Sequence, residues 1–105
     1  MKKIYNKLVR DRIPAIIKES GSHCTYHKAT GTELEEALLN KLIEEVNEFI
    51  QDPCIEEMAD IQEVLWSIQK FFKLSEYDLM VTINAKSNER GSFDQGVILE
   101  HVSDN

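Results

Sequence analysis

Residues 32–72, TELEEALLNKLIEEVNEFIQDPCIEEMADIQEVLWSIQKFF, decide the fold of this chain. Apolar residues recur here at helical spacing in two runs: Leu34, Leu38, Leu42, Val46 and Phe49, then Met58, Ile61, Val64, Leu65, Ile68 and Phe72. Such spacing predicts two long amphipathic helices. Because the turn residues Asp52 and Pro53 lie between the two runs, we expect an antiparallel pair joined by a tight turn.

The boundaries of these two helices can be predicted from capping residues. Thr32 and Glu35 form a capping box, so we expect the first long helix to begin there and to end near Gln51. Asp52 suits an N-cap and Pro53 a first helical turn, so we expect them to open the second long helix.

The flanking segments add shorter elements. Pro14 predicts a short helix after an extended entry, and Ser75 with Asp78 predicts a third helix that frays near Gly91. Residues 24–27 favour β structure and suit either an edge strand or an ordered loop. Residues 97–99 suggest a short extended tail. The chain is therefore expected to be an all-α helical bundle.

Length and charge limit the functional classes. A chain of 105 residues suits a single domain over residues 1–105. Its net charge of −7 argues against nucleic acid or an anionic membrane as a partner. Cys24 and Cys54 are too few for a disulfide framework, no signal-peptide pattern opens the chain, and no apolar run is long enough to span a bilayer. We expect a cytoplasmic protein with reduced thiols.

Several carboxylates lie where a core would be expected. Glu45 falls inside the apolar stripe of the first long helix, and Glu57 lies at the centre of the stripe of the second. Glu48 and Asp60 follow three residues later, at the edges of the same stripes. By contrast, four other acidic residues fall on polar arcs and are expected to be solvated: Glu35, Glu36, Glu56 and Glu63.

Burial of such carboxylates without a cation would cost several kcal/mol per ion, so a cation is expected beside them. Oxygen ligands alone favour Mg²⁺, with Mn²⁺ as a substitute. A di-iron site needs histidines on the facing helices. His23, His27 and His101 all lie outside the two long helices, which disfavours iron.

Two groups of basic residues accompany the acids. Lys86 and Arg90 are one helical turn apart and are suited to holding phosphate oxygens, although two surface cations near a helix end would have the same spacing. Lys7, Arg10 and Arg12 form a second basic group, for which a solvated surface segment is the alternative.

The acidic motifs resemble those of a known family. EEVNE at 44–48 followed by EMAD at 57–60 is similar to the paired acidic motifs of the MazG-like all-α nucleoside triphosphate pyrophosphohydrolases, and NAKSNER at 84–90 resembles the basic stretch that follows them. YNKLVRDRIP at 5–14 and RGSF at 90–93 resemble a small stand-alone branch described as phosphoribosyl-ATP pyrophosphohydrolase-like.

The resemblance implies Mg²⁺-dependent hydrolysis of a nucleotide between its α- and β-phosphates, in a four-helix core completed by dimerisation. It implies metal-ligand roles for Glu45, Glu48, Glu57 and Asp60. It implies that Glu44 or a ligand such as Glu45 orients the attacking water, and that Asn84, Lys86 and Arg90 bind the phosphates. The base and sugar of the nucleotide stay open.

A rival interpretation is a non-catalytic, oligomerising helical module whose acidic face binds an ion or a partner. Both interpretations predict self-association, because Leu39, Ile43 and Ile50, together with Val46, widen the stripe of the first long helix. A single chain of three longer helices is too small to cover this face, so we expect a homodimer or a higher oligomer.

Overall fold

The computed structural model describes residues 2–104, and these residues form four helices and no strand. The helices are α1 (Ile13–Glu19), α2 (Gly31–Gln51), α3 (Ile55–Phe71) and α4 (Glu76–Arg90). The predicted all-α class is therefore confirmed. The chain divides into two compact units, the first ending at Lys73 and the second beginning at Leu74. The expectation of a single domain over residues 1–105 stays a prediction.

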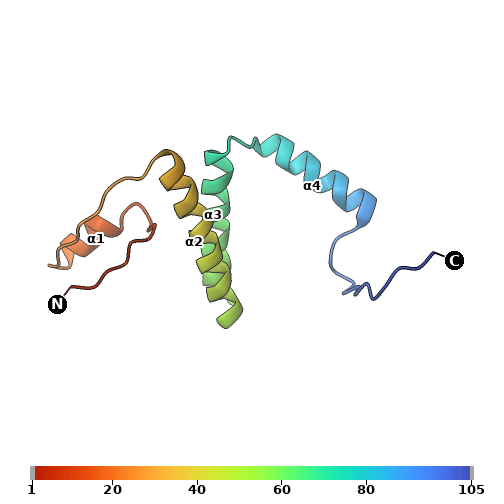
Figure 1. The fold of residues 1–105 in the computed structure, drawn as a ribbon, viewed down its shortest axis with the longest axis horizontal. Coiled ribbons are helices and arrows are strands. Elements are labelled where there is room, and N and C mark those ends of the chain that lie inside the picture. The colour runs from red at the N-terminus through yellow and green to blue at the C-terminus, as the bar shows by residue number, and fades with distance from the viewer. Residues whose placement is uncertain (1, 105) are drawn as a thin grey trace. The chain divides into compact units, whose positions relative to one another are not determined.

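Helices α2 and α3 form an antiparallel hairpin, as the two apolar runs predicted, and they lie side by side in Figure 1. Leu38 on α2 and Val64 on α3 are the buried apolar residues of the described chain. Glu45, two turns after Leu38 on the same face of α2, is equally buried at 5% exposure. The hairpin core is therefore small and contains a carboxylate.

The predicted capping box at Thr32 is wrong. Helix α2 begins at Gly31, and its N-cap is Thr30, whose side chain makes no capping hydrogen bond. Gly31 has φ of +57°, a left-handed value that glycine adopts without a Cβ clash. The extended chain can therefore turn into the helix at this glycine, before it reaches Thr32.

The predicted N-cap at Asp52 is also wrong. Asp52 is instead the C-cap of α2, where its backbone N–H donates to the carbonyl of Glu48. Pro53 lies in the turn, and α3 begins at Ile55 with the extended residue Cys54 as its N-cap. Because Asp52 still closes the preceding helix, it cannot also open the next one.

The shorter helices agree better with the sequence. Helix α1 carries Pro14 in its first turn, as expected. In the second unit, Ser75 is the N-cap of α4, and its Oγ accepts a hydrogen bond of 2.9 Å from the backbone N–H of Asp78. Helix α4 ends at Arg90, and Gly91 follows with φ of +83°. Residues 24–27 form no strand, so the ordered-loop alternative holds for them.

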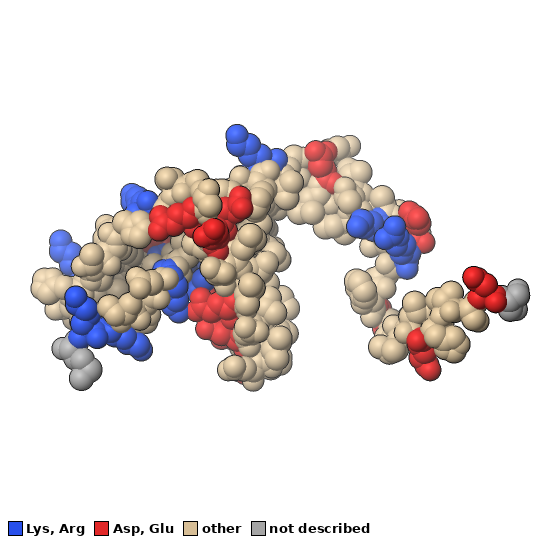
Figure 2. Space-filling view, in the orientation of Figure 1, with Lys and Arg blue, Asp and Glu red and all other residues tan. Residues whose placement is uncertain are grey.

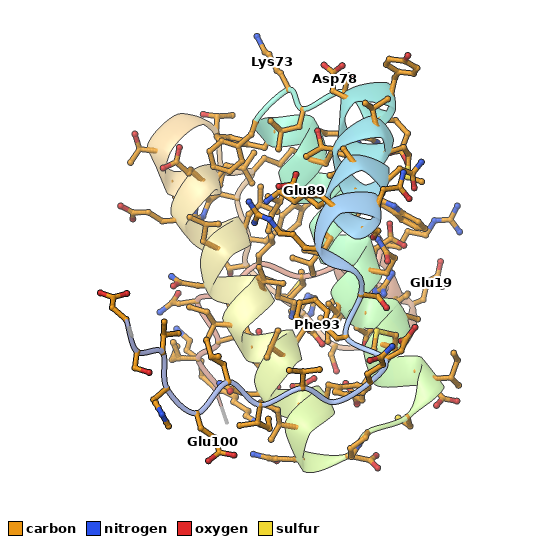
Figure 3. All side chains as sticks on the ribbon, turned by 90° about the vertical axis from the view of Figure 1, so that its right-hand side faces the viewer. Glu19, Lys73, Asp78, Glu89, Phe93 and Glu100 are labelled. Atoms are coloured by element: carbon orange, nitrogen blue, oxygen red, sulfur yellow. The ribbon has the colours of Figure 1, made fainter. Side chains whose placement is uncertain are left out.

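Lys73, two residues after the end of α3, has an unusual backbone conformation. Lys73 has φ of +56°, in the left-handed region that non-glycine residues rarely adopt. Its backbone N–H donates to the carbonyl of Lys70, which closes the helix in the manner of a left-handed C-terminal cap. Its side chain points away from the helix end in Figure 3.

The outer face of α2 keeps much of its apolar surface. Four residues are between 38% and 67% exposed, and they are the ones that widen its predicted stripe: Leu39, Ile43, Val46 and Ile50. Dimerisation through this face stays a prediction. Among residues 2–104, no helix combines the length and the apolar character needed to cross a bilayer.

Candidate metal centre

Three of the predicted ligands converge between α2 and α3. One carboxylate oxygen from each of Glu45, Glu57 and Asp60 lies within 4.8 Å of the other two. Glu45 comes from α2, whereas Glu57 and Asp60 are one turn apart on α3 and share a face. The hairpin therefore brings together residues from both acidic motifs.

Two oxygens of this group lack any partner. Glu45 Oε2 and Glu57 Oε2 are buried, and neither accepts a hydrogen bond from a described residue. A buried oxygen atom without a partner carries an uncompensated desolvation penalty. A divalent cation with oxygen ligands would satisfy both atoms, so the donor set fits Mg²⁺ or Mn²⁺.

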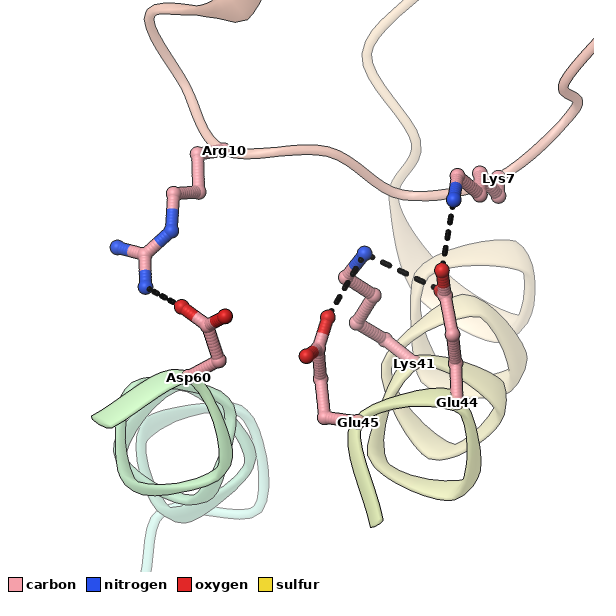
Figure 4. A network of polar contacts seen from close by, with 6 residues as sticks. All are labelled: Lys7, Arg10, Lys41, Glu44, Glu45 and Asp60. Atoms are coloured by element: carbon pink, nitrogen blue, oxygen red, sulfur yellow. Dashed lines mark hydrogen bonds and ion pairs between the residues drawn. The ribbon is translucent and has the colours of Figure 1, made fainter. Parts of the chain in front are cut away.

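Lysine compensates part of the buried charge. Lys41, one turn before Glu45 on α2, places its Nζ 3.2 Å from Glu45 Oε1 and 3.1 Å from Glu44 Oε2. Its side chain is only 16% exposed. Lys41 thus neutralises one oxygen of Glu45 and leaves the other oxygen of that carboxylate directed away from the lysine (Figure 4).

The two adjacent glutamates of α2 have opposite electrostatic environments. Burial raises the pKa of Glu45; Lys41 opposes this effect, whereas the nearby carboxylates of Glu48 and Asp60 add to it. For Glu44, a hydrogen bond from Lys7 lowers the pKa, and Lys41 acts in the same direction. Glu44 is therefore held as an anion, while the charge on Glu45 is unfavourable even beside Lys41.

Residues 7–10, which we call the basic strap, bring two further cations to the acids. Lys7 Nζ lies 2.6 Å from Glu44 Oε1, and Arg10 Nη2 lies 2.6 Å from Asp60 Oδ1. Arg10 Nη1 also lies 3.5 Å from Glu63 Oε1. Figure 4 shows the strap passing over both helices, and Figure 2 shows acidic and basic side chains lying close together on this unit.

The sequence pointed to these cations only in part. The basic group at Lys7, Arg10 and Arg12 was visible, but nothing local indicated that two of its members meet the carboxylates. Glu63 and Glu56 are exposed as expected, whereas Glu35 is half-buried. Glu63 also forms a long ion pair of 3.5 Å with Arg10, which the sequence did not predict.

The remaining predicted site residues are placed as follows. Glu48 is exposed and does not belong to the converging group, although its charge contributes to raising the pKa of Glu45. Asn84, Lys86 and Arg90 lie on α4 in the second unit. The ligand role of Glu48 and the phosphate role of the three α4 residues stay predictions.

A cavity of about 230 Å³ adjoins this network on the α2 side. Its lining includes Asn6, Lys7, Asn40, Lys41 and Glu44. Ligand pockets for whole drug-sized molecules have volumes of roughly 300–1,000 Å³, so this space suits only part of a nucleotide. Lys7 and Glu44 therefore contribute to the wall of this cavity.

Comparison of the chain with protein-family models, with curated proteins and with solved structures finds no match.

Proposed function

We propose that this protein is a Mg²⁺-dependent nucleotide pyrophosphohydrolase that cleaves a nucleoside triphosphate, or a related nucleotide, between the α- and β-phosphates. The products are a nucleoside monophosphate and pyrophosphate. The observation that supports it most strongly is the pair of buried oxygens without partners, Glu45 Oε2 and Glu57 Oε2, in a group of three converging carboxylates. The acidic motifs that resemble the MazG-like family support the same proposal.

Under this proposal Glu45, Glu57 and Asp60 hold the cation, and Glu48 completes the ligand set. A divalent cation with oxygen ligands polarises phosphoryl oxygens and offsets the charge that develops in the transition state. Mg²⁺ commonly completes its coordination with substrate phosphates, which links a carboxylate site of this kind to a phosphoanhydride substrate.

We assign the roles of the other site residues from the motifs that resemble the MazG-like family and from the local chemistry. Glu44 is kept ionised by Lys7 and Lys41, so it is suited to accept a hydrogen bond from an attacking water. Lys86 and Arg90 on α4 bind phosphate oxygens, together with Asn84. A homodimer brings a second hairpin against the exposed apolar face of α2 and so makes a four-helix core.

One observation favours the rival function, a non-catalytic module. Lys41 and Arg10 already pair with Glu45 and Asp60, so part of the acidic charge is compensated without any metal. In that case the chain would still bind an ion at Glu45 and Glu57 but would hydrolyse no nucleotide.

A pyrophosphate-release screen over nucleotides in the presence of Mg²⁺ separates the two functions. Release that depends on Mg²⁺ supports the enzyme, and Asp60→Asn should then reduce kcat at least about tenfold, because it removes a ligand charge. Glu56→Gln, an exposed change on the same helix, is the matched control and should keep the wild-type rate. No release from any nucleotide, from a protein that binds Mg²⁺, would support the non-catalytic module instead.

A further inference from the structure

The basic strap carries the most accessible cations of the metal centre. Lys41 is committed to two carboxylates and is largely buried, so it is fixed as an internal counter-ion. Lys7 and Arg10 differ from it, because their side chains are 43% and 55% exposed. A ligand arriving from solvent can therefore reach both strap residues directly.

Arg10 has hydrogen-bonding capacity to spare. An arginine has five N–H donors in a planar fork, and Arg10 directs its two Nη atoms at Asp60 and Glu63. The contact with Glu63 is long, at 3.5 Å. With more than half of its side chain exposed, the guanidinium retains N–H groups for an anionic ligand that binds beside Asp60.

Lys7 occupies the equivalent position on the α2 side. Its Nζ forms an ion pair with Glu44, and Lys7 also lines the cavity that adjoins the network. The strap therefore presents one cation beside Asp60 on α3 and another beside Glu44 on α2 (Figure 4).

Charge balance explains why such cations belong at this place. A polyphosphate would be repelled by a group of carboxylates, and a single divalent cation offsets only part of that repulsion. Ion pairs as exposed as Lys7–Glu44 and Arg10–Asp60 contribute little to folding stability. Binding of an anionic ligand therefore accounts for these two cations better than a contribution to folding stability does.

We propose that Lys7 and Arg10 bind the phosphate chain of the substrate, with Arg10 contacting phosphate oxygens at the Asp60 side of the metal and Lys7 contacting them at the Glu44 side. This inference rests on the proposed function, since it assigns the ligand of the same metal centre. The ligand class is a polyphosphate bound together with a divalent cation.

The test measures binding without hydrolysis, with inorganic tripolyphosphate as the probe. Isothermal titration calorimetry in Mg²⁺ gives its dissociation constant for the wild type, for Arg10→Ala and for Lys7→Ala. Each variant should weaken binding about tenfold or more, because a charge-assisted hydrogen bond is lost. Arg12→Ala removes the same charge two residues from Arg10, at an exposed position, and should bind tripolyphosphate like the wild type.

A thermal shift measured with Mg²⁺ alone distinguishes the loss of a phosphate contact from damage to the metal centre. Arg10→Ala should keep the Mg²⁺-induced rise in melting temperature while losing the further rise caused by tripolyphosphate. Wild-type affinity in both strap variants, equal losses in Arg10→Ala and Arg12→Ala, or loss of the Mg²⁺ response in Arg10→Ala would each overturn the inference. Tripolyphosphate binding that depends on the strap, without release of pyrophosphate from any nucleotide, would uphold the inference and contradict only the proposed hydrolysis.

Discussion

Arg10 and Asp60, fifty residues apart in the sequence, are joined by a hydrogen bond of 2.6 Å between Nη2 and Oδ1. The bond attaches the basic strap to α3, at a carboxylate that also belongs to the candidate metal centre. It raises the already high pKa of the Arg10 guanidinium. The strap and the carboxylates thus form one electrostatic unit.

Metal binding should stabilise the first unit. Mg²⁺ that binds the native state alone adds about 2.7 kcal/mol to the free energy of unfolding at one hundred times its dissociation constant. The double variant Glu45→Gln/Glu57→Gln should lose this Mg²⁺-dependent stabilisation, because it removes the negative charge from both carboxylates that have a buried oxygen without a partner. Urea unfolding followed by the fluorescence of Trp66, the single tryptophan, measures the effect. The control Glu56→Gln should respond to Mg²⁺ like the wild type, and an unmoved wild-type curve would rule out the metal centre.

The cost of the Glu45 charge should appear as a pH dependence in metal-free buffer. Because burial raises the pKa of Glu45, the folded state binds this proton more tightly than the unfolded state. The contribution of Glu45 to stability is therefore favourable at acid pH and is lost as the pH rises from about 4.3 through the raised pKa. Glu45→Gln should be more stable than the wild type at pH 7, and the difference should shrink below pH 4. Equal loss of stability at both pH values would contradict the prediction.

Glu44 should have the opposite pH dependence. Hydrogen bonds from Lys7 and Lys41 lower its pKa, so its contribution is present above the ordinary glutamate pKa and is lost as the pH falls through the lowered value. We expect Glu44→Gln to lower the free energy of unfolding by about 1 kcal/mol or less at pH 7, since the pair with Lys7 is partly exposed. Urea titrations at pH 7 and at successively lower pH check this, and a difference from the wild type that does not shrink as the pH falls would count against it.

Self-association should depend on the outer face of α2. Ile43 and Ile50 are 60% and 67% exposed and lie two turns apart on that face, so a charge at either position would be buried in the proposed dimer. Sedimentation equilibrium should show a dimer for the wild type and a 12.1 kDa species for Ile43→Glu and Ile50→Glu. Ile16→Glu, at an exposed position on α1, is the control and should remain dimeric. A wild-type monomer at micromolar concentration would refute the dimer.

The backbone at Lys73 offers a test of the fold itself. Its left-handed conformation costs a non-glycine residue about 1 kcal/mol, so Lys73→Gly should raise the free energy of unfolding by up to that amount. Lys70→Gly, inside α3, should instead lower it by about 1 kcal/mol. A destabilised Lys73→Gly would show that the lysine side chain, rather than its backbone, matters at this position.

The sequence by itself determined the helices and the unusual carboxylates of the hairpin. Apolar spacing is a local property, since residues three and four apart lie on one face of any helix. It therefore located α2 and α3 and identified Glu45 and Glu57 as charges on a buried face. It failed at the exact helix starts, because the N-caps Thr30 and Cys54 make no side-chain capping hydrogen bond, so their residue types give little signal.

Only the tertiary structure decided which cations meet these carboxylates. Lys7 pairs with Glu44 across 37 residues, and Arg10 with Asp60 across 50 residues. Such pairs arise only after the strap has been placed across the hairpin, and no periodicity connects residues so far apart. Lys41 was predictable beside Glu45, because one helical turn separates them. The difference is physical: contacts within a helix follow from its pitch, whereas contacts between segments depend on how the whole unit folds.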